Sequence, residues 1–279
     1  MLALHARRSA SSIQAWASAH PGHGLGVVMS GTDLYRDIAL DATARQSLVL
    51  AQQLVVLQEC GIEALPDQVQ AKARVIYQST SQRRSLPKSG RQLRVVMVGH
   101  LREVKSPQTL FEAARLLRNR ADIRISHIGR AEEPGWAEQA MATQTDCPGY
   151  RWLGPLPHAQ TRSAIQRAHV LVHTSAMEGG AHVIMEAARS GTPVLASRVS
   201  GNVGMLGADY QGYFPHGDAA ALAGLLTRCR DEQTLGPSCP QPGLLTHLEA
   251  QCALRAPLFA PQAERAALLE LIQDLQETR

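Results

Sequence analysis

The sequence is poor in the residues and motifs that mark several classes of protein. Aromatic residues make up only 4% of its 279 residues, which argues weakly against a surface that stacks nucleic-acid bases. The five cysteines include no C-x-x-C pair, so we expect neither a disulfide framework nor a zinc site, and a reducing cytoplasm is the expected location. No apolar run approaches the roughly 20 residues of a membrane span. Neither H-E-x-x-H nor D-x-D occurs, and we therefore predict that the protein uses no metal.

The composition that is present is that of an ordinary globular protein, with 44% hydrophobic and 19% charged residues. The length suffices for one large domain or two modest ones. The formal net charge is +4, and the basic residues are scattered rather than gathered in a stripe. A solvated face explains them, although a mild positive field would also suit anionic substrates such as phosphates. We expect no nucleic-acid partner.

Short apolar runs alternate with helical patterns in the first third of the chain. The runs GLGVVM from Gly24, QLVVLQ from Gln53 and RVIYQS from Arg74 predict buried strands. Between the first two, DATARQSLVLAQQ predicts a helix with Asp41 as its N-cap. The polar stretch 79–92 contains proline and glycine without periodicity, and is the best candidate for a linker.

Beyond the linker the alternation becomes regular. A strand is predicted over Leu93–Gly99, a helix enters at Ser106-Pro107, another ends with Gly191 as C-cap, and a later one begins with Asp218 as N-cap. Repeated β-α units predict a parallel sheet covered on both faces, that is, a doubly wound nucleotide-binding domain. The last helix, PQAERAALLELIQDL, has an apolar stripe and must pack on another part of the chain.

We predict three parts: an N-terminal lobe over 1–85, a Rossmann-like lobe over 86–245, and C-terminal helices over 246–279 that pack back on both.

The chain opens in an apolar segment, Met1–Leu4, whose pattern is typical of the middle of a strand. The N-terminal half also has few β-α units. We therefore expect the first one or two units to be missing; the alternative is a true start with a short lobe.

The most informative segment is the loop and helix start over 174–187, which follows the apolar run HVLVH. A parallel sheet places such a loop at its carboxyl edge, where ligands bind. Gly179 and Gly180 leave the backbone bare before the helix, which favours an anion such as a diphosphate. Glu178 and Glu186 would repel phosphate, so they suit sugar hydroxyls, one on a transferred sugar and one on a ribose. The alternative is a capping carboxylate followed by a solvated Glu186.

This segment, E-G-G-x-x-V-x-x-E-A followed by S-G-T-P-V-L-A-S, resembles the E-x7-E element of the family 4 glycosyltransferases. VGHLREVKSPQTLFEAARLL is similar to that family's first C-terminal strand, glycine turn and lysine, and HGD before DAAALAGLL also matches. The resemblance covers about 93–226. It implies the GT-B fold: an α/β architecture of two Rossmann-like lobes with parallel sheets, the N-terminal lobe here being incomplete.

The resemblance also implies roles for single residues. The donor would be a UDP-sugar, a substrate rather than a cofactor, and no cofactor is expected. Gly99, Gly179, Gly180 and Lys105 would hold the diphosphate. Lys105 would also neutralise the charge that builds on the leaving group. Glu178 would then bind the hexose and Glu186 the ribose.

Two positions depart from the family pattern. The arginine that usually follows the first glycine turn is replaced by His100, and either Arg102 takes over its phosphate contact or the contact is lost. The usual Gly-x-x-Glu turn is replaced by SGNVGMLG over 200–207, whose glycines either bring backbone N–H groups to a ligand or form a plain flexible loop. His173 ends the preceding strand and either approaches the diphosphate or caps the strand.

LALHARRSASSI, MSGTDLYRDI and RAPLFAPQAERAALLELI, together with the motifs above, resemble one branch of that family, the selenosugar synthases of selenoneine biosynthesis. Those hexosyltransferases move a sugar from a UDP-sugar to selenophosphate. The resemblance implies an N-terminal acceptor site in which Arg7, Arg8 and Arg36 bind the anion, with Asp33 beside them and His5 in a catalytic role. Surface arginines, a packed histidine and a turn aspartate are the alternatives.

Two rival functions remain. One keeps the fold with a hydroxyl acceptor, a sugar or a lipid, and the other is an inactive nucleotide-sugar-binding remnant.

Overall fold

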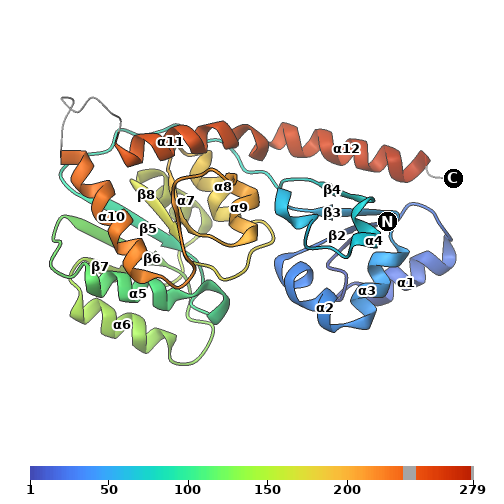
Figure 1. Cartoon of the computed structure of the whole chain (residues 1–279), viewed down its shortest axis with the longest axis horizontal. Helices are drawn as coiled ribbons and strands as arrows, with labels where there is room; N and C mark the ends of the chain where they lie inside the picture. Colours follow the sequence, from blue (N-terminus) through green and yellow to red (C-terminus); the bar gives the residue numbers. More distant parts are fainter. Residues whose placement is uncertain (235–242, 278–279) are drawn as a thin grey trace.

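The computed structural model describes residues 1–234 and 243–277 and contains two parallel sheets, each in its own α/β lobe (Figure 1). The N-terminal sheet has the order β1-β2-β3-β4. Its strands are β1 (Leu2–Leu4), β2 (Gly26–Val28), β3 (Gln53–Val56) and β4 (Ala73–Val75). The helices between and beside them are α1 (Ala10–Ala19), the π-helix η1 (Asp33–Asp37), α2 (Ile38–Leu40), α3 (Ala42–Leu50), η2 (Glu59–Gly61) and α4 (Asp67–Gln70).

The second sheet has six strands in the order β10-β9-β8-β5-β6-β7. The strands are β5 (Leu93–Val98), β6 (Ile123–Ile128), β7 (Tyr150–Trp152), β8 (Val170–His173), β9 (Val194–Ser197) and β10 (Tyr213–Phe214). The connecting helices are η3 (Glu103–Lys105), α5 (Pro107–Leu116), α6 (Trp136–Asp146), α7 (His158–Arg167), α8 (His182–Ala188), α9 (Ser200–Leu206) and α10 (Ala219–Thr234). Helices α5, α6 and α10 cover one face, and α7, α8 and α11 (Leu244–Arg255) cover the other (Figure 1).

This strand order places a topological switch between β5 and β8. Numbered in chain order and read from β7, the strands run 3-2-1-4-5-6, the usual order of a dinucleotide-binding sheet. The chain leaves β5 towards β6 on one side and arrives at β8 on the other. The loops that follow these two strands therefore diverge at the carboxyl edge and leave a crevice between them, as predicted for the C-terminal half.

Two predicted helix starts are confirmed by side-chain caps, and the start at Ser106-Pro107 is confirmed by Pro107 as the first residue of α5. Asp41 accepts hydrogen bonds from the first N–H groups of α3, and Oδ1 of Asp218 lies 2.8 Å from the backbone nitrogen of Ala221 in α10. Gly191 ends α8 as predicted, a few residues after the last helical residue, Ala188. It takes the left-handed φ of +66°, and the N–H groups of Gly191 and Thr192 donate to the carbonyls of Ala188 and Ala187.

The two lobes touch at glycines. A Cβ on Gly179 would lie 2.3 Å from the backbone nitrogen of Gly31, and one on Gly180 would lie 2.8 Å from Cβ of Leu57. The stretch 200–207, which we expected to be a loop, forms helix α9 and packs on η2 of the other lobe. No side chain could be added at these contacts without moving the lobes apart.

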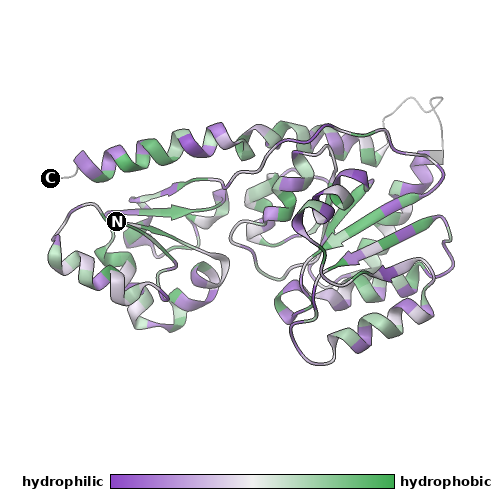
Figure 2. Cartoon of the chain, turned by 180° about the vertical axis from the view of Figure 1, so that it is seen from behind, coloured by the Kyte–Doolittle hydropathy of each residue, from purple (hydrophilic) through white to green (hydrophobic). Residues whose placement is uncertain are grey.

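The C-terminal end of the chain closes the open face of the N-terminal sheet. After η4 (Ala256–Phe259), helix α12 (Pro261–Glu277) runs along that sheet (Figure 1). Leu271 and Leu275 of α12 pack with Val55 and Ile76 in one buried cluster. Figure 2 shows the result, with hydrophobic strands inside and hydrophilic positions on the outer faces of the helices. Among the helices described, none combines the length and the apolar character that crossing a bilayer requires.

Replacing Leu271 by alanine should lower the free energy of unfolding by about 2–5 kcal/mol, because the truncation leaves a cavity where α12 docks. Leu271 is 0% exposed, whereas Leu269 on the same helix is 51% exposed. Denaturant unfolding of Leu271→Ala and of the control Leu269→Ala measures the difference. Equal stabilities of the two variants would show that α12 does not hold the N-terminal sheet.

Candidate active site

A cavity of about 410 Å³ opens at the carboxyl edge of the six-stranded sheet, at the switch between β5 and β8. Its wall is built from the loops after β5, β6 and β8, the segment before α7, and the first turn of α8. The lining residues are Val98, Gly99, His100, Arg102, Lys105, Ile128, Gly129, Pro155, Leu156, Thr161, His173, Glu178, Gly180, Ala181, His182 and Val183. The glycines of this wall leave backbone groups uncovered, and its basic side chains outnumber its acidic ones. Both features suit the binding of an anion.

Glu178 is the centre of the polar network in this cavity. Its Oε1 lies 2.5 Å from Nζ of Lys105 and 3.1 Å from Nε2 of His173. Burial acts to raise the pKa of Glu178, but the hydrogen bonds and charges of these two partners outweigh burial and hold the pKa well below its usual range. Glu178 is therefore an ionised acceptor that faces basic groups, which is the state needed to bind a hydroxyl.

Two hydrogen bonds to backbone carbonyls of η3 explain why Lys105 and Glu178 meet. The carbonyl of Lys105 accepts a hydrogen bond of 2.6 Å from the hydroxyl of Thr174, and the N–H of Ala176 donates to the carbonyl of Val104 at 2.9 Å. Ser106 follows with φ +46°, a left-handed turn that starts α5 directly behind the lysine. The loop after β8 is thus tied to η3, although the two segments are about 70 residues apart in sequence.

Glu186 is buried in α8 at 3% exposure and is not the solvated residue of the alternative interpretation. One oxygen, Oε1, lies 2.8 Å from Nε2 of His158, 3.7 Å from Nε of Arg162 and 3.7 Å from Nδ1 of His182. Burial acts to raise the pKa of this carboxyl, but the three nitrogens lower it below its usual value. The other oxygen, Oε2, receives no hydrogen bond from the residues that the structure describes.

The other predicted donor-site residues fall into two groups. Gly99, Gly180 and Arg102 line the cavity. Gly179 does not line it and instead packs against the backbone of Gly31 across the lobe contact. His100 and Arg102 both approach Glu132, at 3.6 and 3.8 Å between charged atoms, so this acidic side chain competes with an incoming anion for the two basic groups.

The predicted acceptor residues gather in a second cluster, at the end of β1 and in η1. Nδ1 of His5 lies 3.0 Å from Oδ1 of Asp33, whose second oxygen accepts the N–H of Ala6 at 2.7 Å. His5 has φ +72°, so its backbone turns sharply as β1 ends. Burial raises the pKa of Asp33, although the backbone N–H of Ala6 and the charge of His5 act against it.

Asp37 completes this cluster and was missed by the sequence analysis. Its Oδ2 lies 2.9 Å from Nε of Arg7 and its Oδ1 lies 3.3 Å from Nε of Arg36. Arg8 is exposed, and its backbone N–H donates to Nδ1 of His5 at 3.4 Å. His5, Asp33 and Asp37 offer three possible metal-ligand atoms within 4.8 Å of one another. Asp37 is already paired with two guanidinium groups, whereas Asp33 is paired with His5 and with backbone N–H groups. None of the predicted acceptor residues lines the cavity of the other lobe.

Sequence reasoning also missed three partners of Glu186, namely His158, Arg162 and His182. His158 is 28 residues from Glu186 and reaches it only because α7 and α8 pack side by side. His182 and Glu186 are four residues apart on one helix. That spacing was a usable signal, since residues at i and i+4 share a helix face.

Known proteins resemble this chain in both sequence and structure. The D-inositol 3-phosphate glycosyltransferase of Corynebacterium glutamicum (strain R) is 32% identical over 144 residues, which cover 47% of this chain and 34% of that protein. The protein of the same name from Corynebacterium urealyticum is 31% identical over 157 residues, 52% of this chain and 37% of that protein. The matched part is therefore about a third of the length of these curated relatives.

The structural neighbours share the fold at low identity. HepE of Anabaena in complex with UDP aligns with a TM-score of 0.77 at 17% identity, over 98% of this chain and 78% of that one. TarM of S. aureus aligns with a TM-score of 0.69 at 14% identity, over 88% of this chain and 50% of that one. The two parallel α/β lobes are those of the GT-B fold, as the sequence predicted. Because residues 78–235, more than half of the chain, match the family described as Glycosyl transferases group 1, the chain belongs to that family.

Proposed function

We propose that the protein is a metal-independent hexosyltransferase that takes a sugar from a UDP-sugar. The observation that carries this proposal is the cavity at the β5/β8 switch, in which one ionised carboxylate, Glu178, faces Lys105 and His173. A relative of the same fold, HepE, was crystallised with UDP. The donor needs no further cofactor, because a nucleoside diphosphate is already a leaving group that basic side chains can stabilise.

In this proposal the diphosphate lies against Gly99 and Gly180, where no side chain blocks the backbone, and Lys105 and Arg102 face its charge. As the bond between the anomeric carbon and the diphosphate oxygen breaks, its electron pair stays on UDP. The ammonium group of Lys105 has three N–H donors, so it can keep one on Glu178 and turn another to the departing oxygen. Positioning and charge stabilisation would then supply the rate.

The carboxylates of Glu178 and Glu186 bind the two sugar rings of the donor. Glu178 is ionised and accepts hydroxyls of the hexose, and Glu186 accepts those of the ribose. Gly179 remains a proposed ligand of the diphosphate. Its backbone packs on Gly31 in this arrangement, so it could contact the diphosphate only if the two lobes moved apart.

For the acceptor we propose a small anion, selenophosphate, on the sequence resemblance stated above. Beside η1, the guanidinium groups of Arg7 and Arg36 contact Asp37 and are exposed, as is Arg8 next to Arg7 in the chain, and these are the cations that would bind an anion. Selenium would attack the anomeric carbon, a carbon–selenium bond would form, and UDP would leave.

His5 is the proposed catalytic residue of the N-terminal lobe. Nδ1 lies 3.0 Å from Oδ1 of Asp33 and accepts a hydrogen bond of 3.4 Å from the backbone N–H of Arg8, and these two neighbours hold the ring in one orientation. Nε2 is buried and has no hydrogen-bond partner among the described residues. We propose that this nitrogen orients the acceptor. The same proposal divides the chain into an acceptor lobe over 1–85, a donor lobe over 86–245, and helices over 246–279 that join them.

A second candidate is transfer to a hydroxyl group. The observation that favours it is the similarity to two D-inositol 3-phosphate glycosyltransferases, which extends over about half of this chain. The donor site would be unchanged in this case, and only the acceptor would differ.

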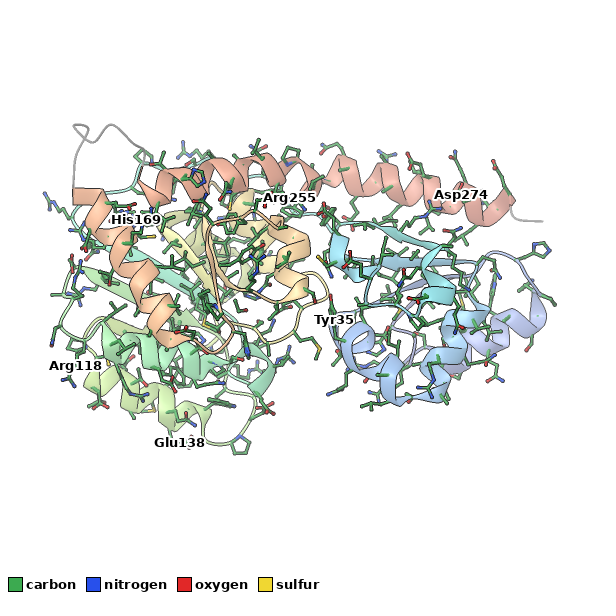
Figure 3. All side chains as sticks on the ribbon, in the orientation of Figure 1. Tyr35, Arg118, Glu138, His169, Arg255 and Asp274 are labelled. Atoms are coloured by element: carbon green, nitrogen blue, oxygen red, sulfur yellow. The ribbon has the colours of Figure 1, made fainter. Side chains whose placement is uncertain are left out.

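We expect Lys105→Ala and Glu178→Ala each to lower kcat by roughly 100- to 1,000-fold, because each variant loses one group that stabilises the transition state. Arg118→Ala and Glu138→Ala are matched controls, since both side chains are exposed and lie at the outer edge of the lobe (Figure 3). UDP release from a UDP-sugar measures turnover. Unchanged rates in the first pair would remove the assignment.

The acceptor is tested by supplying UDP-glucose or UDP-N-acetylglucosamine with selenophosphate, and in parallel with inositol phosphate and simple sugars. The proposal predicts a product with the isotope pattern of selenium in mass spectrometry, formed only with selenophosphate. Product from a hydroxyl acceptor alone would establish the second candidate. Binding of UDP without turnover on any acceptor would mean that the chain is a binding remnant.

A further inference from the structure

The surroundings of Glu186 assign a role to a residue that neither the sequence nor the family resemblance singles out. Three nitrogen-bearing side chains converge on a single oxygen of this buried carboxylate, and they come from two different helices, α7 and α8. The inference below rests on the proposed donor site, in which Glu186 accepts ribose hydroxyls.

Arg162 is the partner of Glu186 that other hydrogen bonds hold in place. The residue is 3% exposed, and its guanidinium group is fixed by hydrogen bonds of 2.6 Å to the hydroxyl of Thr80 and 2.8 Å to the carbonyl of Ser81. Its Nε points at Glu186 from 3.7 Å and has no hydrogen-bond partner among the described residues. Arg162 therefore supplies charge but cannot move to follow the carboxylate.

His158, unlike Arg162, is a solvent-exposed partner of Glu186. Its side chain is 75% exposed at the start of α7, yet its Nε2 makes the shortest contact with Glu186, 2.8 Å to Oε1. His182 adds a longer contact of 3.7 Å to the same atom and lines the cavity. Leu156 and Thr161, two and three residues from His158, line the cavity as well, whereas His158 and Glu186 themselves are not among its lining residues.

Because all three contacts fall on Oε1, the orientation of the carboxylate is set and Oε2 is left to accept a ligand hydroxyl. We propose that His158 is a positioning residue for the nucleotide: by holding Oε1 of Glu186 it presents Oε2 to the hydroxyls of the ribose. An exposed histidine contributes little to stability, so this contact is explained better by a role in binding than by a role in folding.

The test compares binding of UDP and of 2′-deoxyuridine diphosphate by isothermal titration calorimetry. The wild type should prefer UDP by about tenfold, the worth of one hydrogen bond to a charged acceptor. In His158→Ala, the dissociation constant of UDP should rise by about fivefold and the preference should fall below about twofold, because Glu186 is no longer held. His158→Gln, whose amide can donate from nearly the same place, should regain part of both.

Gln160→Ala is the matched control, since Gln160 is exposed on the same helix. It should leave both dissociation constants unchanged. A wild-type preference that survives intact in His158→Ala would overturn the inference and leave the donor site standing. Tighter UDP binding in that variant would overturn it too, because His158 would then compete with the ribose. Failure of the wild type to bind UDP would refute the proposed function itself, and this inference with it.

Discussion

Buried carboxylates are the constraint on which the rest of this structure depends. An ionised carboxylate that loses its water must be paired, or it takes up a proton. Glu178 is paired by a lysine from one loop and a histidine from the end of a strand. That requirement draws η3 and the loop after β8 together, and backbone bonds between the same two segments reinforce it. The cavity between β5 and β8 takes its shape from this pairing.

The same rule operates at the other two acidic centres. Glu186 is surrounded by side chains of α7 and α8, and the pair Asp33 and Asp37 by groups from β1 and η1. Each centre joins an element to its neighbour at the carboxyl edge of a sheet, where polar groups gather because the strands themselves are apolar. Three sites of different chemistry thus arise from one physical requirement.

The contact between the lobes depends on the absence of side chains. Gly31, Gly179 and Gly180 bring backbone against backbone or against Leu57. A glycine can serve either a ligand or a neighbouring segment, and sequence alone does not distinguish the two uses. Gly180 lines the cavity as well as touching the other lobe, whereas Gly179 serves the lobe contact in this closed arrangement.

The sequence by itself determined the elements and their class. Apolar runs such as those of β5 and β8, and caps such as Asp41 and Asp218, depend on neighbours within a few residues, and periodicity and capping chemistry reveal such neighbours. The resemblance to a known motif also singled out Glu178 and Lys105, which the structure brings within 2.5 Å of each other. Only the tertiary structure decided that His158 and Arg162 meet Glu186, that Asp37 joins His5, and that residues 200–207 form a helix docked on the other lobe. The residues in these contacts are not spaced at the period of a helix or a strand, so no sequence pattern indicates that they meet. Only the packing of helices and lobes brings them together.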